Sequence, residues 1–493
     1  MSEQLFFPWV SASVLLPLGV ALWAWRQTVA ETARRGAVYG LAGSFLMLVA
    51  AGAQAAAAHG ATLREPLPGW AQWVAVDALN ALPLPLYAAL ALGLVALAPR
   101  RKVTPHWTAG VLLLSASTLA AYAADNLALL ALAWTASIVP FLFNRFFSIA
   151  GEAPLPALAR GILAGSAVMM IAGAAVLVLE TPGADWHARL SLSLPRTGQP
   201  TLLFCAFGFL MVAVFLRKGL APAHSWVLTS YERGPLLPLT LLFNGHLGAF
   251  LIARLILPAL PDVSRAALPL LGDLGLLTAG YTALLAVAER KPRRLLALLA
   301  ISQASFLVVG LESGNPDAIA GALVHWQVVV VATALLTAVY TGIEARLGAA
   351  PDGRGFLGLA LGAPRLAVFF LAGGLALVGL PLTLGFCAED LLLHGTLETH
   401  PHLGIVMPIV TALNAFHVVR LFAALFLGKP VAAAPRIADA LPRERWVLTA
   451  AMLFLLVGGL RPAAFVHFPA AAAERLAALV GAPAQTAVIK EKE

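Results

Sequence analysis

The chain is a series of long apolar segments joined by short connections, beginning at Leu5 and continuing almost to the last residue. Each segment is about as long as the roughly 20 residues that a helix needs to cross the hydrocarbon of a bilayer. Only helices and closed barrels satisfy all of their backbone groups there, and these Ala- and Leu-rich segments lack the alternation of a barrel strand. The sequence therefore predicts an all-α polytopic membrane protein.

About fourteen transmembrane helices are expected. Their approximate starts are Leu5, Gly36, Val76, His106, Leu127, Leu155, Thr201, Pro235, Ala266, Leu295, Asp317, Arg365, Gly404 and Trp446. Because the loops are too short for a soluble domain, we assign residues 1–462 to a single transmembrane domain. Residues 463–493 form a short tail whose alanines surround Glu474 and Arg475, a composition typical of a helix lying at the membrane interface.

Charge is scarce and unevenly placed. Of the 493 residues 60% are hydrophobic and 11% are charged, whereas soluble domains carry about 25% charged residues. The net charge of +8 would suit a nucleic-acid partner, but the cations lie between apolar segments, which is the pattern of membrane topology. Most of them fall in alternate loops, such as 100–102 and 290–294, which are therefore expected in the cytoplasm. An even number of helices then puts both termini outside the cytoplasm, in a cell inner membrane.

Metal and disulfide chemistry is not expected in this chain. Its two cysteines, Cys205 and Cys387, both lie inside apolar segments. No Cys/His spacing resembles a zinc site, and two isolated cysteines form no disulfide framework. The first apolar segment is not preceded by a basic region, so a cleaved signal peptide is not expected. The sequence predicts no cofactor and no bound metal.

The stretch 217–254 places polar groups where the composition indicates lipid. Arg217 and Lys218 end one apolar segment, His224 follows in a proline-containing connection, and His246 lies inside the next apolar segment. An ionisable side chain near the bilayer centre costs at least about 2.5 kcal/mol, so each is a functional candidate. Arg217 and Lys218 lie near a predicted boundary, where extension of the side chain to the surface is the alternative. His224 and His246 are the groups best suited to carry protons.

Three more candidates lie farther along the chain. His325 sits well inside the eleventh segment, where it suits a proton relay, although a lone buried histidine is more often simply packed and hydrogen-bonded. Glu389 and Asp390 follow a proline and a glycine that predict a broken helix lining a wet cavity, as in transporters. The two carboxylates equally suit the outer end of a helix.

A polar stripe is expected in the thirteenth segment. Asn414, His417 and Arg420 are spaced by three residues, so they share approximately one face of a helix. Polar side chains inside a transmembrane helix are not expected to face lipid. This spacing adds His417 to the candidate site.

Several stretches resemble the antiporter-like proton-translocating subunits. They are KGLAPAHSWV (218–227), KPRRLLALLAISQASFLVVGLESGNPDAIAGALVHW (291–326), GLPLTLGFCAEDLLL (379–393) and LNAFHVVRLFAALFLGK (413–429). That family includes the large membrane subunits of respiratory complex I, the Mrp sodium/proton antiporters and the membrane subunit of DAB-type inorganic-carbon transporters. The resemblance covers roughly residues 70–430. It implies fourteen helices that contain two inverted five-helix repeats, each with a broken helix.

The chain departs from this family pattern at several relay positions. Pumping members pair a glutamate of the fifth helix with a lysine of the broken seventh helix, and here these positions match Thr135 and Arg217, with Lys218 beside the latter. Thr333 falls near the family's lysine of the eleventh helix, and Glu389 near that of the twelfth. Threonine cannot bind and release a proton near neutral pH, and arginine stays protonated. The remaining candidates for a proton path are Arg217, Lys218, His224, His246, His325, Glu389, Asp390 and His417.

The resemblance implies a transporter subunit and no enzyme activity in this chain. Its compact length and the stretch LFNGHLGAF (242–250) are most similar to the DAB branch. The expected function is therefore that of the proton-conducting membrane subunit of an energy-coupled inorganic carbon (CO2/bicarbonate) uptake complex. Its expected partner is a large peripheral zinc-containing subunit that resembles carbonic anhydrase. The alternatives are a proton- or sodium-translocating subunit of a complex I, membrane hydrogenase or Mrp assembly, and a non-conducting membrane anchor.

Overall fold

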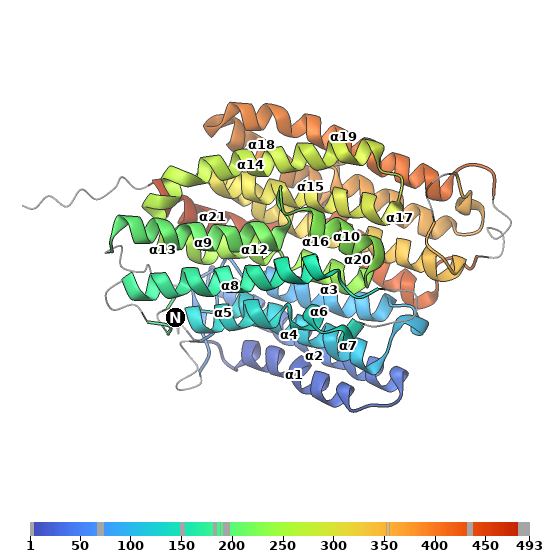
Figure 1. Ribbon diagram of the computed structural model, residues 1–493, viewed down its shortest axis with the longest axis horizontal. Coiled ribbons are helices and arrows are strands. Elements are labelled where there is room, and N and C mark those ends of the chain that lie inside the picture. The colour runs from blue at the N-terminus through green and yellow to red at the C-terminus, as the bar shows by residue number, and fades with distance from the viewer. Residues whose placement is uncertain are drawn as a thin grey trace, which may run out of the picture.

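The computed structural model describes residues 4–66, 73–147, 153–180, 185–187, 189–190, 198–351, 353, 355–430 and 437–481. Over these residues the chain is almost entirely helical, which confirms the predicted fold class. The long helices run side by side as one bundle (Figure 1). Among the described residues, the strands are β1 (Leu63–Arg64) and β2 (Ala75–Val76), a short antiparallel pair between the second and third helices.

Proline begins most of the long helices. Its ring presets φ for a helix, and the N–H that it lacks would find no partner in the first turn. The helices that begin in this way are α3 (Pro83–Leu97), α4 (Pro105–Ala123), α9 (Pro200–Lys218), α14 (Pro261–Ala288), α15 (Pro292–Glu312), α16 (Pro316–Leu347), α17 (Pro364–Leu377), α19 (Pro401–Phe426) and α20 (Pro442–Leu460). Proline therefore indicates where these helices begin, in addition to the change in hydropathy.

The other helices complete the bundle. They are α1 (Trp9–Trp25), α2 (Ala30–Ala57), α5 (Leu127–Ala136), α6 (Val139–Leu142), α7 (Asn144–Phe147), α8 (Ala157–Glu180), α10 (Ser225–Arg233), α11 (Leu236–Asn244), α12 (Leu247–Leu251), α13 (Leu257–Ala259), α18 (Leu384–Thr399) and α21 (Ala463–Gly481), with a π-helical turn η2 (Ile252–Ile256) and two 3-10 turns, η1 (Arg100–Lys102) and η3 (Leu359–Leu361). Each expected start lies at or near the start of one of these helices. The count of fourteen spans and the inverted repeats stay predictions.

The centre of the bundle is formed by α15, α16 and the run from α11 to α13. In the described part of the chain, nine helices are long and apolar enough to cross a membrane, and the apolar windows of these three are wholly buried. The outer helices α2, α8, α9 and α19 instead bury only 33–39% of theirs, so much of their apolar surface points outward. Polar groups on the central helices are therefore shielded from lipid by other helices.

Three interruptions divide helices inside the bundle. The first separates α9 from α10 after Gly219, which adopts φ +65°, and the second separates α11 from α12 at His246, which adopts φ +40°. The third separates α17 from α18, where Gly379 and Leu382 adopt φ +71° and +73°. The predicted broken helices near Pro222 and Pro381 are confirmed.

Both described ends of the chain form hydrogen bonds with the connection between α2 and α3. The N–H of Leu5 donates to the carbonyl of Arg64 at 2.8 Å, and Arg475 of α21 donates to the carbonyl of Gly60 at 3.0 Å. Helix α21 lies along α16, since Gln327 donates to the carbonyl of Phe465. Its depth relative to the membrane interface and the side that faces the cytoplasm stay predictions. The last residues of the predicted tail, 482–493, lie outside the described residues.

Buried charges tie helices together at the opposite end. Arg293 at the start of α15 holds Glu344 near the end of α16 through two hydrogen bonds of 2.6 and 2.7 Å, and Lys102 lies 3.6 Å from the same carboxylate. Outside the helices, partial burial opposes ionisation of Glu289, yet the backbone N–H of Lys291 and the Arg294 guanidinium hold its pKa below the usual range. The cations of these connections, which predict the membrane topology, therefore also hold the ends of neighbouring helices together.

Replacing Arg293 with methionine is expected to destabilise the protein by about 3 kcal/mol, because the buried Glu344 would lose its two-bond partner and, among the described residues, keep Lys102 at 3.6 Å as its ion-pair partner. The readout is the thermal unfolding midpoint of the purified full chain. Arg290→Met, at an exposed neighbour of the same connection, is the matched control and should unfold like the parent. Equal midpoints for the two variants would contradict a structural role for this ion pair.

Replacing Gly379 with alanine is expected to cost at least about 1–2 kcal/mol, because its φ of +71° disfavours any side chain. The added Cβ would also lie 2.4 Å from Oε2 of Glu389 and displace that carboxylate. The control is Gly19→Ala in α1, where a Cβ meets no atom within 4 Å and a helical glycine is replaced by a better helix former. Thermal unfolding of both variants decides, and an unchanged midpoint for Gly379→Ala would refute the expectation.

Candidate functional site

Arg217 and Lys218 point into the bundle rather than toward its surface. They end α9, and their exposed fractions are 5% and 4%. Such burial rules out extension to the surface, which the sequence left open. In the described part of the chain, neither side chain forms an ion pair with a carboxylate.

Arg217 is met by a hydroxyl and an aromatic ring. Its Nη2 donates to Oγ of Ser137, and its guanidinium carbon lies 5.3 Å from the centre of the Trp134 ring. The hydroxyl of Thr135, which stands where the resembling family carries a glutamate, donates to the carbonyl of Ala131 in its own helix. The hydroxyl dipole of Ser137 and the π-face of Trp134 therefore stabilise the Arg217 charge. Neither group can accept its proton, so Arg217 stays positively charged.

Lys218 faces His246 across the interrupted helix. Its Nζ lies 3.5 Å from Nδ1 of His246, at the limit of hydrogen bonding. A Cβ at residue 248 would lie 2.7 Å from Cγ of Lys218, so Gly248 provides the room for the lysine stem. The left-handed backbone of His246, uncommon for a residue other than glycine, presents its ring at the break. The fold thus brings together two groups that are 28 positions apart in the sequence.

Two tyrosines donate to carbonyls at the break, one of them the Gly245 carbonyl and the other the Leu241 carbonyl, which also accepts from the N–H of Gly245 at 3.2 Å. Tyr122 of α4 donates to the carbonyl of Gly245, and Tyr87 of α3 donates to that of Leu241 at 3.1 Å. Sequence reasoning missed both residues. The available signal was the hydroxyl itself, because a tyrosine buried in an apolar helix needs a hydrogen-bond partner.

His325 lies close to the Lys218–His246 pair. Its Nε2 is 3.1 Å from the carbonyl of Gln303, and its neighbour Trp326 packs edge-on against the ring of His246 at 6.2 Å. Among the described residues, Nδ1 of His325 and Nε2 of His246 have no hydrogen-bond partner. One polar centre therefore joins α9, the α11–α12 break and α16.

Asn244 and Thr333 extend this centre toward the middle of α16. The Thr333 hydroxyl lies 3.0 Å from Oδ1 of Asn244 and 2.6 Å from the carbonyl of Val329, and Asn244 donates to the carbonyl of Val330 at 3.3 Å. Both side chains are neutral. They therefore connect the helices at this level without adding a group that titrates near neutral pH.

Glu389 and Asp390 both line one cavity, but they differ in exposure. Glu389 lines a cavity of about 360 Å³ with Gly379 and Thr411, and its Oε1 has no hydrogen-bond partner among the described residues. The Asp390 side chain is 53% exposed and its Oδ1 lies 3.5 Å from Nδ1 of His394. The break between α17 and α18 therefore buries one carboxyl group and leaves the other at the surface.

The predicted polar stripe of α19 faces other helices. Asn414 donates to Oγ of Ser302 at 2.8 Å, and Nε2 of His417 lies 2.8 Å from the carbonyl of Ala283. Arg420 donates to carbonyls at the end of α14, including that of Val287 at 2.7 Å. His417 therefore lies between α19 and α14 rather than beside His246.

His224 occupies the break between α9 and α10. Its ring packs edge-on against Tyr281 at 5.2 Å, and Trp226 beside it donates to the carbonyl of Leu216 at 2.8 Å. No hydrogen bond within the described residues joins His224, Glu389 or His417 to the Lys218–His246 pair. The eight candidates thus form one central group and several separate ones, and their roles stay predictions.

A family model described as "NADH:quinone oxidoreductase/Mrp antiporter, TM" matches residues 124–414. Subunit N of the NADH-quinone oxidoreductase of Parafrankia sp. (strain EAN1pec) is 30% identical over 253 residues, which cover 50% of this chain and 48% of that protein. Subunit 14 from Thermus thermophilus is 30% identical over 296 residues, covering 59% of this chain and 64% of that protein. The aligned part spans about half the length of the first curated relatives.

Solved structures share the fold along nearly the whole chain. A chain of respiratory complex I from Thermus thermophilus with bound NADH has a TM-score of 0.82 at 25% identity, covering 96% of this chain and 100% of that chain. A chain of the Mrp complex from Dietzia sp. DQ12-45-1b has a TM-score of 0.77 at 18% identity over the same shares, which shows the fold alone. With the family model matching more than half of its residues, the chain belongs to the family of NADH:quinone oxidoreductase and Mrp antiporter transmembrane subunits.

Proposed function

We propose that this protein is the proton-conducting, antiporter-like membrane subunit of a larger energy-coupled assembly. The observation that carries the proposal is the buried contact between Lys218 and His246, 3.5 Å apart, in which no carboxylate of the described residues takes part. An ammonium group buried without a counter-ion is costly. The cost of burying Lys218 is explained if its ammonium group releases a proton to the neighbouring imidazole of His246.

The pair can share one proton in either direction. A protonated Lys218 donates through Nζ to the unprotonated Nδ1 of His246, and Nε2 of the same ring is free to pass a proton onward. Arg217 next to it stays charged and repels a second positive charge, so it favours departure of the proton from Lys218. The two adjacent cations thus have different roles, one as a fixed field and one as a carrier.

The onward path is proposed through His325 on α16. His325 is adjacent in sequence to Trp326, whose ring contacts that of His246, and Nδ1 of His325 has no hydrogen-bond partner within the described residues. The exit is proposed through Glu389, in the cavity at the α17–α18 break, and then through Asp390 at the surface. His417, beside α14, is proposed to lie on a side branch of this path. His224, half-buried at the α9–α10 break, is proposed as the group through which protons enter.

The first candidate for the assembly is a redox-linked or antiporter complex. Its support is the family and the relatives, whose names place them in NADH-quinone oxidoreductases. The second candidate is an inorganic-carbon uptake complex with a large peripheral zinc-containing, carbonic-anhydrase-like partner. The observation that favours it is local: Arg217 meets Ser137 and Trp134 where pumping relatives are expected to supply a carboxylate. The zinc would belong to that partner.

Replacing Lys218 with arginine is expected to lower proton flux at least tenfold, because arginine keeps the charge but does not release its proton. Flux is measured by fluorescence quenching in inverted membrane vesicles from cells that express the full chain in its native assembly. His246→Gln should have a similar effect. Lys291→Arg, at a 58% exposed lysine that pairs with Glu232, is the matched control and should leave flux unchanged.

Unchanged flux in Lys218→Arg would remove Lys218 from the path. If His325→Ala and Glu389→Gln also leave the flux of the assembly unchanged, that flux does not pass through these residues, and the chain is better described as a membrane anchor in an assembly that conducts elsewhere.

The class of assembly is tested by purification of the tagged full chain from its native membranes, followed by identification of bound proteins by mass spectrometry. Recovery with quinone-reductase, hydrogenase or antiporter subunits is expected. Recovery with one large zinc-containing peripheral protein would contradict the first candidate and support carbon uptake. Recovery of the chain alone would contradict an assembly of either kind.

A further inference from the structure

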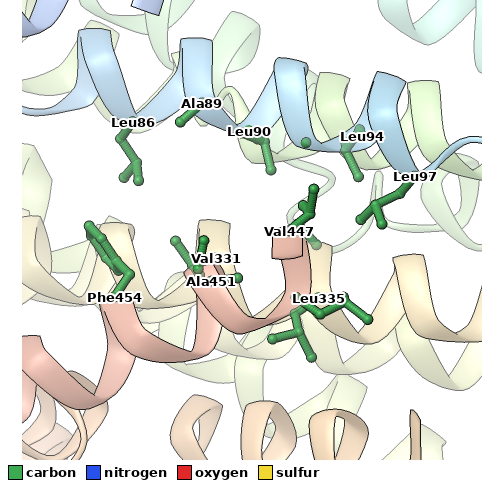
Figure 2. A pocket seen from close by; sticks show the side chains of 14 residues that line it. Leu86, Ala89, Leu90, Leu94, Leu97, Val331, Leu335, Val447, Ala451 and Phe454 are labelled. Carbon is green, nitrogen blue, oxygen red and sulfur yellow. The ribbon is translucent and has the colours of Figure 1, made fainter. Parts of the chain in front are cut away.

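An apolar groove lies between α3, α16 and α20, away from the polar centre. Leu86, Leu90 and Leu94 of α3 point across it toward Val447 and Phe454 of α20, and Val331 of α16 forms its floor (Figure 2). Its volume is about 190 Å³, and none of its lining side chains is polar. Many of the lining residues are only partly buried, so the groove opens to the outside of the bundle.

One end of the groove carries a cluster of arginines. Arg443 lies one helical turn before Val447 on the same face of α20, and Arg100 lies three residues past the last groove residue of α3, Leu97. Arg34 of α2 reaches the same place, since it donates to the carbonyls of Val95 and Ala96. Arg443 and Arg100 are near enough to act on the charge of Arg34.

The cluster has more positive charge than its acidic neighbour can balance. Glu31 lies 3.6 Å from Arg34 and 3.9 Å from Arg100, and it also contacts the exposed Arg35. Within the described residues, Nε and Nη1 of Arg443 are buried and have no hydrogen-bond partner. Buried guanidinium N–H groups are ordinarily satisfied, so these two are available to an anion.

The dimensions match one leaflet of a bilayer. From Leu86 to Leu97 a helix rises about 16 Å, close to half of the roughly 30 Å hydrocarbon core. A groove of this length with cations at one end suits a molecule that has an acyl chain and a phosphate about one leaflet apart.

We infer that this groove and its arginine cluster form a binding site for an anionic phospholipid, with one acyl chain between α3 and α20 and the phosphate at Arg443, Arg34 and Arg100. The apolar walls exclude a free anion from the groove, and the cluster prefers a net negative headgroup over a zwitterionic one. The bound lipid would seal α20 against α3 at the edge of the bundle.

The test uses the purified full chain, native mass spectrometry and added dioleoyl phosphatidylglycerol or dioleoyl phosphatidylcholine. Retention of phosphatidylglycerol over phosphatidylcholine is expected. Arg443→Gln should weaken phosphatidylglycerol binding about five- to tenfold, as loss of one basic contact does. Arg445→Gln, at an exposed arginine two residues along α20, is the matched control and should bind like the parent.

Two further variants keep the test decisive if Arg443→Gln does not fold. Arg443→Lys keeps the charge and should retain binding, whereas Ala89→Phe fills the groove and should abolish it with the arginines intact. Equal retention of both lipids, or unchanged phosphatidylglycerol binding in Ala89→Phe, would overturn the proposal.

Two other occupants are distinguished by separate measurements. If inorganic phosphate raises the thermal unfolding midpoint as much as phosphatidylglycerol does, the cluster is a free-anion site and the proposal fails. If a cysteine at residue 89 cross-links in native membranes to another protein, a partner segment fills the groove and the proposal likewise fails. Stabilisation by phosphatidylglycerol alone, without a protein cross-link, supports the lipid site.

Discussion

Backbone groups released inside an apolar bundle must find partners within the protein, and this constraint governs the arrangement around each helix break. The carbonyl of Gly245 at the α11–α12 break is met by Tyr122, and that of Leu216 near the α9–α10 break is met by Trp226. At the α17–α18 break, the Thr383 hydroxyl donates to the carbonyl of Leu380 at 2.6 Å. The helix breaks are tolerated inside the bundle because aromatic and hydroxyl donors satisfy the carbonyls beside them.

Three cations show three ways of stabilising a charge in the bundle; Arg293 and Arg217 are buried and Arg420 is partly exposed. Arg293 is paired with a carboxylate, Arg420 is surrounded by backbone carbonyls at the end of α14, and Arg217 rests on a ring and a hydroxyl. All three are arginines, which keep their proton. Lys218 is different because its nearest polar neighbour is an imidazole that can itself accept a proton. The chemistry of the site depends on this difference between neighbouring residues.

The sequence could predict features that repeat along one helix, but it could not predict pairs that form across helices. The three-residue spacing of Asn414, His417 and Arg420 was enough to place them on one inward face. By contrast, Asp77 and Arg254 form a buried two-bond pair across 177 positions, at 2.5 and 3.0 Å. Hydropathy assigns both of these residues to helix ends, and their contact depends on how distant helices pack.

Helix α16 sets a scale of depth for the whole bundle. Its 32 residues rise about 48 Å, well beyond the roughly 30 Å of hydrocarbon. His325, and with it the Lys218–His246 pair that Trp326 contacts, lies about 12 Å from Thr333 toward the end where α16 begins. The central contact between Thr333 and Asn244 is neutral.

The other half of α16 offers hydroxyls in place of titratable side chains. Between Thr333 and Glu344, Thr337 and Thr341 recur every fourth residue on the face of Thr333, and the hydroxyls of Thr333 and Thr341 each donate to the carbonyl four residues earlier. A proton that leaves His325 in this direction would meet about 28 Å of helix with no imidazole, amine or carboxyl group on it before Glu344. This half of α16 therefore offers no relay that titrates near neutral pH, and the proposed path instead leaves α16 at His325 toward Glu389.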